Sequence, residues 1–153
     1  MHYKLTVISD VHGATEWFQA LVPTINASDY FIFCGDGWSA LRRISPLINV
    51  PMACVRGNTD FDCPLDDLAT INLGGTKALV THGHRQNAKQ GIIGVLEAAK
   101  NKNCALAFHG HTHIFYDRII DGVHIICPGA LLNGSYAIVE GDGTDFTCTQ
   151  KYI

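Results

Sequence analysis

Short apolar runs alternate with stretches of helical spacing along the first third of the chain. The runs are continuous, which predicts strands buried on both faces. They cover residues 5–8, 30–34 and 50–55. Between them, apolar residues recur every three or four positions over residues 14–25 and 38–48, which predicts helices that become irregular near Pro23 and Pro46. This alternation is typical of an α/β protein with parallel strands.

The pattern changes after Pro64, where hairpins replace the strand and helix alternation. Two-residue turns that contain glycine join apolar runs in this part of the chain. These turns lie at residues 74–75, 121–122 and 142–143. One more helix is predicted over residues 92–99, and one more buried strand over residues 105–108.

The composition is that of a globular protein, with 47% hydrophobic and 16% charged residues. A chain of 153 residues suits one ordinary domain, so we expect a single domain over residues 1–153. The net charge of −3 gives no general attraction for nucleic acid or an anionic membrane. The first apolar run is too short for a signal peptide or a membrane span, so we expect a cytoplasmic protein with reduced cysteines.

Polar side chains that can bind a metal follow the predicted strands. These side chains are Asp10, His12, Asp36, Asn58, His82, His111 and His113. Each alone has an ordinary explanation, since Asp10 or Asp36 could cap a helix and Asn58 could hold a turn. Together they indicate a metal site, because ligands bind beyond the carboxyl ends of parallel strands in open α/β sheets, where these loops should converge.

The densest group of histidines is the stretch His109-Gly110-His111-Thr112-His113, predicted to be a loop between two strands. Residues two apart project to the same side of an extended backbone, so we expect His111 and His113 to face one metal. Gly110 would let the backbone bend close to what is bound. The alternative is a polar loop that is rich in histidine without a ligand role.

The mixture of carboxylate, amide oxygen and imidazole suits borderline divalent ions such as Mn, Fe, Zn, Co or Ni. Seven donors exceed one coordination sphere, so two ions that share a carboxylate are the simplest arrangement. Such a pair of ions is typical of enzymes that hydrolyse a phosphorus or carbonyl centre. The residues alone therefore predict a dinuclear hydrolase.

Five ordered motifs span nearly the whole chain. They are Asp10-Val11-His12, Gly35-Asp36, Gly57-Asn58-Thr59-Asp60, His82-Gly83-His84 and Gly110-His111-Thr112-His113. In order and spacing they resemble the motifs of the calcineurin-like metallophosphoesterases, and the short length is similar to that of the YfcE-type phosphodiesterases. The resemblance implies a four-layer α/β/β/α sandwich with two mixed sheets. It also implies hydrolysis of phosphate diesters by a hydroxide that bridges two divalent ions, with manganese expected first.

Carried over by position, the resemblance gives one ligand set for each ion. Asp10, His12, Asp36 and His113 would hold the first ion, and Asp36, Asn58, His82 and His111 the second. Asp36, Asn58 and His111 also receive the catalytic role. Asp60 or a backbone carbonyl is expected to orient the imidazoles. The implied partner is a small phosphoester, with no stable binding of nucleic acid and no membrane, and the oligomeric state stays open, with a homo-oligomer among the outcomes.

Two positions depart from the family pattern. Thr59 stands where many members have a histidine that helps the leaving group, and the Arg that often follows the Pro-Gly turn is missing after Pro128-Gly129. Because threonine does not act as a general acid, we expect esters with acidic leaving groups, such as aryl or nucleotide-type diesters. Arg56 and Arg85 are candidates for a phosphate contact, with exposed surface charge as the alternative.

The competing interpretation is a scaffold without catalysis, since the retromer subunit of this fold lacks part of the ligand set. All seven ligand positions are filled in this chain, which favours an enzyme. His84 and His109 border ligand positions, His84 as a candidate for the pocket wall and His109 as a core or loop residue.

Overall fold

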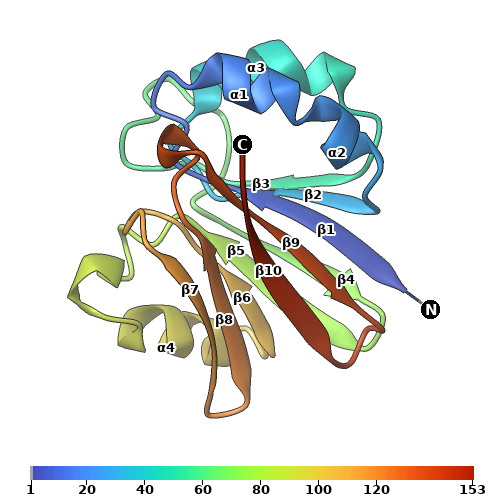
Figure 1. Cartoon of the computed structure of the whole chain (residues 1–153). Helices are drawn as coiled ribbons and strands as arrows, with labels where there is room; N and C mark the ends of the chain where they lie inside the picture. The colour runs from blue at the N-terminus through green and yellow to red at the C-terminus, as the bar shows by residue number, and fades with distance from the viewer. Residues whose placement is uncertain (1) are drawn as a thin grey trace.

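The computed structural model describes residues 2–153 as two mixed five-stranded sheets that pack face to face (Figure 1). The first sheet has the order β10-β9-β1-β2-β3, and the second has the order β4-β5-β6-β8-β7. The strands of the first sheet are β1 (Tyr3–Ile8), β2 (Tyr30–Phe33), β3 (Met52–Cys54), β9 (Ser135–Gly141) and β10 (Phe146–Tyr152). Those of the second are β4 (Leu68–Leu73), β5 (Thr76–Thr81), β6 (Leu106–Phe108), β7 (Phe115–Ile120) and β8 (Val123–Pro128).

Helices cover the outer face of each sheet (Figure 1). The first sheet is covered by α1 (Thr15–Ala20), α2 (Val22–Asn26) and α3 (Trp38–Ile44), and the second by α4 (Ile93–Asn101). Three 3₁₀ turns lie at η1 (Ser45–Leu47), η2 (Ala88–Gln90) and η3 (Leu131–Asn133). The four layers confirm the predicted α/β/β/α sandwich with two mixed sheets. Among residues 2–153 we find no helix with the length and apolar content needed to cross a membrane.

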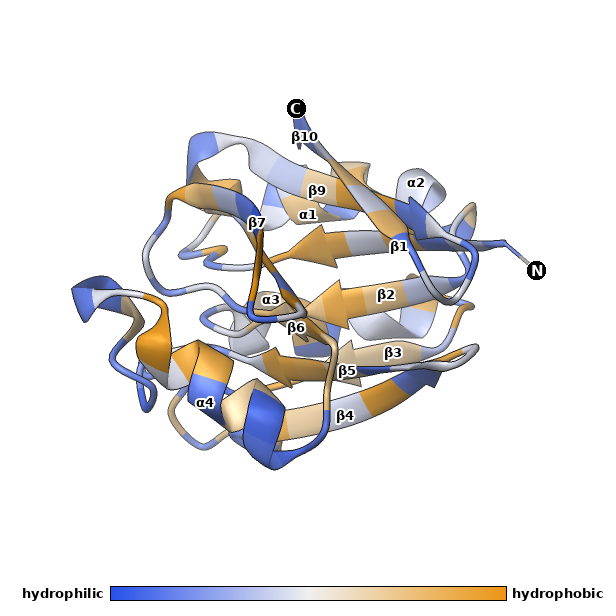
Figure 2. Ribbon diagram, turned by 90° about the horizontal axis from the view of Figure 1, so that it is seen from below, coloured by the Kyte–Doolittle hydropathy of each residue, from blue (hydrophilic) through white to orange (hydrophobic). Residues whose placement is uncertain are grey.

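Apolar side chains fill the space between the layers, and Figure 2 shows hydrophobic residues along the central strands. Val7 and Ile32 of the first sheet share a fully buried cluster with Val80 and Phe108 of the second. A second cluster joins the first sheet to its helices, and a third joins the second sheet to α4. The central strands are thus apolar on both faces, which is why their sequences read as continuous runs.

Several predicted elements are shorter or divided in the structure. The helix predicted over residues 14–25 is two helices that meet at Leu21, close to Pro23, which cannot donate a backbone hydrogen bond. The helix predicted over residues 38–48 ends at Ile44 and continues as a 3₁₀ turn that contains Pro46. The predicted strand 50–55 keeps only β3, which lies at the sheet edge and pairs with β2 alone.

The strand directions place the polar loops together. β1, β2 and β3 are parallel neighbours in the first sheet, and β5 and β6 are parallel neighbours in the second. The loops that follow these strands carry the residues identified from the sequence. The hairpins predicted at residues 74–75, 121–122 and 142–143 are also present, between β4 and β5, β7 and β8, and β9 and β10.

Candidate metal centre

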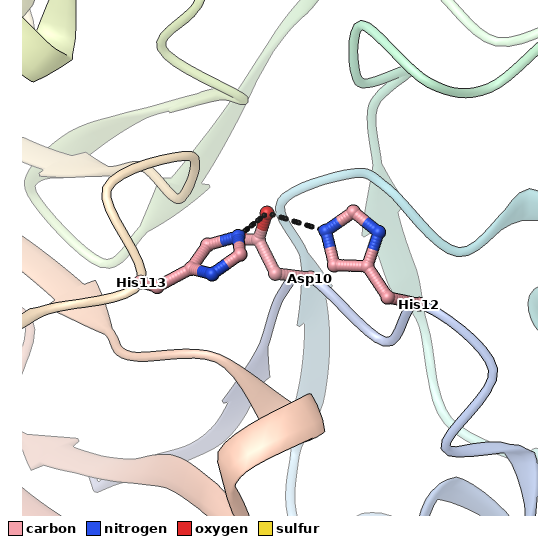
Figure 3. A group of neighbouring side chains, drawn as sticks. All are labelled: Asp10, His12 and His113. Atoms are coloured by element: carbon pink, nitrogen blue, oxygen red, sulfur yellow. Dashed lines mark ion pairs between the residues drawn. The ribbon is translucent and has the colours of Figure 1, made fainter.

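One group of possible ligands contains Asp10, His12 and His113. Asp10 follows β1 and is fully buried. Its Oδ1 atom lies 3.2 Å from Nε2 of His113 and 3.5 Å from Nε2 of His12 (Figure 3). The three ligand atoms lie within 4.8 Å of one another, so one ion could contact all three. His113 comes from the second sheet, and both sheets therefore contribute to this group.

A second group contains Asp36, His82 and His111, whose ligand atoms also lie within 4.8 Å of one another. Nε2 of His82 lies 3.1 Å from Oδ2 of Asp36. The same nitrogen lies 3.0 Å from Oδ1 of Asn58, which brings Asn58 to this group. Nδ1 of His82 donates to the carbonyl oxygen of Cys34 at 2.7 Å, so a backbone carbonyl orients this imidazole, as one of the two sequence alternatives proposed.

The carboxylate of Asp36 lies between the two groups. Its Oδ2 atom is 3.1 Å from His82 and 3.5 Å from Nε2 of His12 in the other group. Its Oδ1 atom accepts a hydrogen bond from the backbone N–H of Thr59 at 3.0 Å, which fixes the orientation. The structure thus brings all seven residues identified from the sequence to one place.

The charges at the site compensate one another incompletely. Burial acts to raise the pKa of Asp36, but the hydrogen bond and charge of His82 outweigh it, and the pKa is lowered. Burial acts to lower the pKa of His82, yet the hydrogen bond that it makes to the carboxylate of Asp36 and the charges of Asp10 and Asp36 raise it. The pKa of Asp36 is thus lowered by His82, and that of His82 is raised by the two carboxylates beside it, a pair that attracts positive charge.

The environment of Asp10 fits a bound cation. Its Oδ2 atom accepts hydrogen bonds from Oγ of Ser9 at 2.6 Å and from the backbone N–H of His111 at 3.0 Å. Its Oδ1 atom is buried and has no hydrogen-bond partner among residues 2–153. Leaving a buried carboxylate oxygen without a partner is costly, and a divalent ion held with His12 and His113 would remove that cost. The donor set of oxygen and imidazole suits the borderline divalent ions.

Five of the seven residues have a left-handed backbone. The φ values of Asp10, His12, Asp36, His111 and His113 lie between 42° and 72°. This conformation is uncommon for residues with a side chain and is often found at functional sites. The prediction of an extended backbone at His111 and His113 is therefore wrong. The left-handed turns send His111 to the second group and His113 to the first, so the two histidines serve different groups.

Asp60 holds the loops in place. Its Oδ1 atom accepts hydrogen bonds from the backbone N–H groups of Gly37 and Trp38, both at 2.9 Å. Its Oδ2 atom accepts from the N–H groups of Asp36 and Gly57, both at 2.8 Å. Asp60 therefore joins the loop after β2 to the loop after β3 and orients backbone amides, whereas the sequence made it one candidate for orienting an imidazole.

Two glycines are required by close packing around the carboxylates. A Cβ atom on Gly110 would overlap Oγ of Ser9 and would lie 2.7 Å from Oδ2 of Asp10. A Cβ atom on Gly57 would overlap Oδ1 of Asp36. The absence of a side chain at Gly110 thus makes room for Ser9 and the carboxylate of Asp10. The sequence had instead indicated that this glycine makes room for the bound metal or substrate. Nothing in the sequence pattern pointed to the contribution of Ser9.

The remaining candidates lie around this site without belonging to either group. Arg56 and Arg85 both pair with Asp67, at 3.2 Å and 2.8 Å, so their charges are partly compensated. The ring of His84 lies 5.4 Å from that of His82, and burial followed by the charge of His82 lowers its pKa. His109 is buried and its Nδ1 donates to the carbonyl oxygen of Gly110 at 2.9 Å, which fits a loop role.

Comparison with known proteins identifies the family. The sequence profile of the calcineurin-like phosphoesterase superfamily domain matches residues 3–143. The chain therefore belongs to the calcineurin-like phosphoesterase superfamily, as its motifs predicted.

Two relatives illustrate this membership. The protein named probable metallophosphoesterase YsnB, from Bacillus subtilis, is 35% identical over 129 residues, which cover 84% of this chain and 75% of that protein. The crystal structure of a predicted phosphoesterase from Streptococcus pneumoniae superposes with a TM-score of 0.87 at 25% identity, covering 99% of this chain and 90% of that one. Both are similar to this chain over most of its length.

The same fold occurs in a protein with a different name. Vps29 from Entamoeba histolytica, solved as a complex with Zn²⁺, superposes with a TM-score of 0.78 at 16% identity. The superposition covers 97% of this chain and 98% of that one. At this identity the similarity concerns the fold alone.

Proposed function

We propose that this chain is a metal-dependent phosphodiesterase that holds two divalent ions. The observation that carries the proposal is the carboxylate of Asp36, which lies between two groups of oxygen and nitrogen donors. Asp10, His12 and His113 would complete one ion site with Asp36. Asn58, His82 and His111 would complete the other. Membership of the phosphoesterase superfamily supports a phosphate ester as the substrate.

The bound ions and the residues that hold them would contribute to hydrolysis in different ways. Two bound ions would lower the pKa of the attacking water and neutralise charge on the phosphoryl oxygens. Thr59 and Asp60 hold the side chain and the backbone of Asp36, so its carboxylate would be in position to bind both ions. His82 is fixed by the carbonyl of Cys34, so its Nε2 atom points into the site without reorganisation.

The preference for esters with acidic leaving groups is inferred from Thr59, which stands beside the metal ligands. Thr59 brings only a hydroxyl to the site, which does not act as a general acid at neutral pH. General acid help is worth about 10² to 10⁴ in rate, so its loss restricts the substrates while the chemistry supplied by two ions is kept. Diesters with acidic leaving groups need this help least.

Reloading the metal-free protein tests the proposal. The protein is stripped with a chelator, and Mn²⁺, Fe²⁺, Zn²⁺, Co²⁺ or Ni²⁺ is then added while calorimetry counts the ions bound per chain. Each form is assayed on an aryl phosphodiester, an aryl phosphomonoester, an alkyl phosphomonoester and a cyclic nucleotide. We expect two ions per chain and diester-selective turnover, highest with manganese. One ion per chain would contradict the dinuclear site, and equal or better turnover of the alkyl monoester would contradict the argument from Thr59.

A scaffold that binds metal without catalysis is the alternative, since Vps29 shares the fold and was solved with Zn²⁺. Ion binding alone does not separate the two functions. Turnover does, because a scaffold would bind both ions and leave every ester in the panel intact.

A further inference from the structure

A pocket of about 360 Å³ opens beside the candidate metal centre. His12 and Asp36 contribute to its wall, so it is continuous with both ligand groups. Trp38, Thr59 and Phe61 also line it. A substrate whose phosphorus lies at the ligands would therefore extend one of its ester groups into this pocket.

The polar groups of the pocket offer no free acid to a departing alcohol. His12 and Asp36 belong to the ligand groups. Asp60 also lines the pocket, but each of its oxygens accepts two backbone N–H groups, so it acts as an acceptor. The other polar groups of the wall are the hydroxyls of Thr15, Ser39 and Thr59 and the indole N–H of Trp38, none of which is an acid at neutral pH. An alcohol that leaves in this pocket must be stable as an anion without receiving a proton from the wall.

The apolar wall favours a flat ring. The side chain of Phe61 is 82% exposed, although a ring of this size usually buries most of its surface. Phe61 directly follows Asp60, whose four backbone contacts hold this part of the loop in place. The side chain of Trp38 packs partly against the apolar cluster under α3, and it also lines the pocket. A ligand ring would cover Phe61 at little cost in loop ordering.

We propose that this pocket binds the leaving group of the ester and that this leaving group is aromatic, a phenol-type alcohol that lies against Phe61 and Trp38. Phenols meet both requirements, since they leave as stable anions and present a flat apolar ring. In the reaction, the oxygen of water bonds to phosphorus and the bond between phosphorus and the aryl oxygen breaks. The electron pair of that bond leaves with the aryl oxygen, one proton of the water passes to solvent, and the other stays on the new oxygen of the phosphate.

The leaving-group role rests on the proposed function, but ring binding does not require turnover. We therefore propose two measurements. In the first, phenol is titrated into the metal-free chain while the indole N–H signal of Trp38 is followed by NMR. We expect a saturable shift, weakened about three- to tenfold by Phe61→Ala, the range for one aromatic contact, and restored by Phe61→Trp. Ile93→Ala, which removes another exposed apolar side chain (68% exposed) from α4, away from the pocket, should leave the titration unchanged.

The second measurement compares two methyl phosphodiesters whose leaving groups have similar acidity, phenol and a fluorinated alcohol without a ring. We expect the manganese-loaded protein to prefer the phenyl ester, and Phe61→Ala to reduce the ratio of the two kcat/KM values about three- to tenfold, mainly through KM. An unchanged ratio would overturn the proposal, as would a phenol titration without a shift at Trp38.

The two measurements also separate this inference from the proposed function. Turnover of both esters without phenol binding would refute the aromatic pocket and leave the phosphodiesterase standing. Phenol binding without any turnover would refute the phosphodiesterase, and with it the leaving-group role, while the ring site would remain.

Discussion

The carboxylate of Asp36 links the two halves of the candidate site, with Oδ2 at 3.1 Å from His82 and 3.5 Å from His12. Replacing it with an amide removes the charge and keeps the shape. We expect Asp36→Asn to reduce manganese-dependent hydrolysis of an aryl phosphodiester by more than about 100-fold, beyond the 10- to 100-fold effect of outer partners. Turnover and the far-UV spectrum are measured together. Asp66→Asn, at an exposed aspartate, is the matched control, and unchanged turnover of Asp36→Asn would reject the shared carboxylate.

His82 makes the stability of the metal-free chain depend on pH. Burial acts to lower its pKa, but Asp36 and Asp10 raise it above the ordinary value. Its stabilising contribution is therefore complete below the unfolded pKa near 6.5 and is lost as pH rises through the folded pKa. The lowered pKa of Asp36 gives a contribution that is present above about 3.9 and is lost as pH falls. The combined contribution of His82 and Asp36 to the stability of the metal-free chain should therefore be largest between about pH 4 and 6.5.

Urea unfolding in the presence of a chelator measures this dependence. The urea concentration at the midpoint of unfolding should decrease as the pH is raised from 6 to 9. The variant His82→Gln should show a smaller decrease over this range. His2→Gln, at an exposed histidine, should keep the slope of the parent protein. Parallel profiles for the parent and His82→Gln would show that this histidine does not carry the effect.

At the scale of elements, the loops after β2 and β3 are held together by Asp60 through four backbone N–H groups. An asparagine has one oxygen and cannot accept all four. We expect Asp60→Asn to lower the free energy of unfolding by about 1 to 3 kcal/mol and the affinity for manganese by about 10- to 100-fold. Urea titrations and calorimetry measure the two effects, with Asp66→Asn as the control. A stability loss without an affinity loss would mean that Asp60 does not position Asp36.

The strand loops also show how far the sequence predicts the site. Continuous apolar runs identified the central strands, and the strand-end rule gathered Asp10, Asp36 and Asn58 correctly, because both depend on local pattern. The left-handed backbone at His111 and His113 was missed, since it is imposed by contacts such as that between the His111 N–H and Asp10, which are distant in sequence. The same reason explains why the role of Asp60 on backbone amides could not be predicted.

At the scale of the whole molecule, both ligand groups combine residues from the two sheets, so bound ions would join the sheets. Ions bound by the folded chain alone stabilise it, by about 2.7 kcal/mol for one site at a hundred times its Kd. For a chain of this length we expect the melting temperature of the stripped protein to rise by about 5 to 10 °C for each ion bound, with manganese at that concentration. Calorimetry with and without added chelator measures the rise. Tight ion binding without any rise would mean that the ions do not join the sheets.

The central place of β1 has a consequence for synthesis on the ribosome. One neighbour of β1 is β2, which follows soon after it, but the other is β9, which is made more than a hundred residues later. Leu131 and Leu132, just before β9, also donate backbone hydrogen bonds to the carbonyl oxygens of Ser9 and Asp10. The nascent chain must therefore keep one edge of its first strand open until its last hairpin emerges, and Asp10 can take its final position only then.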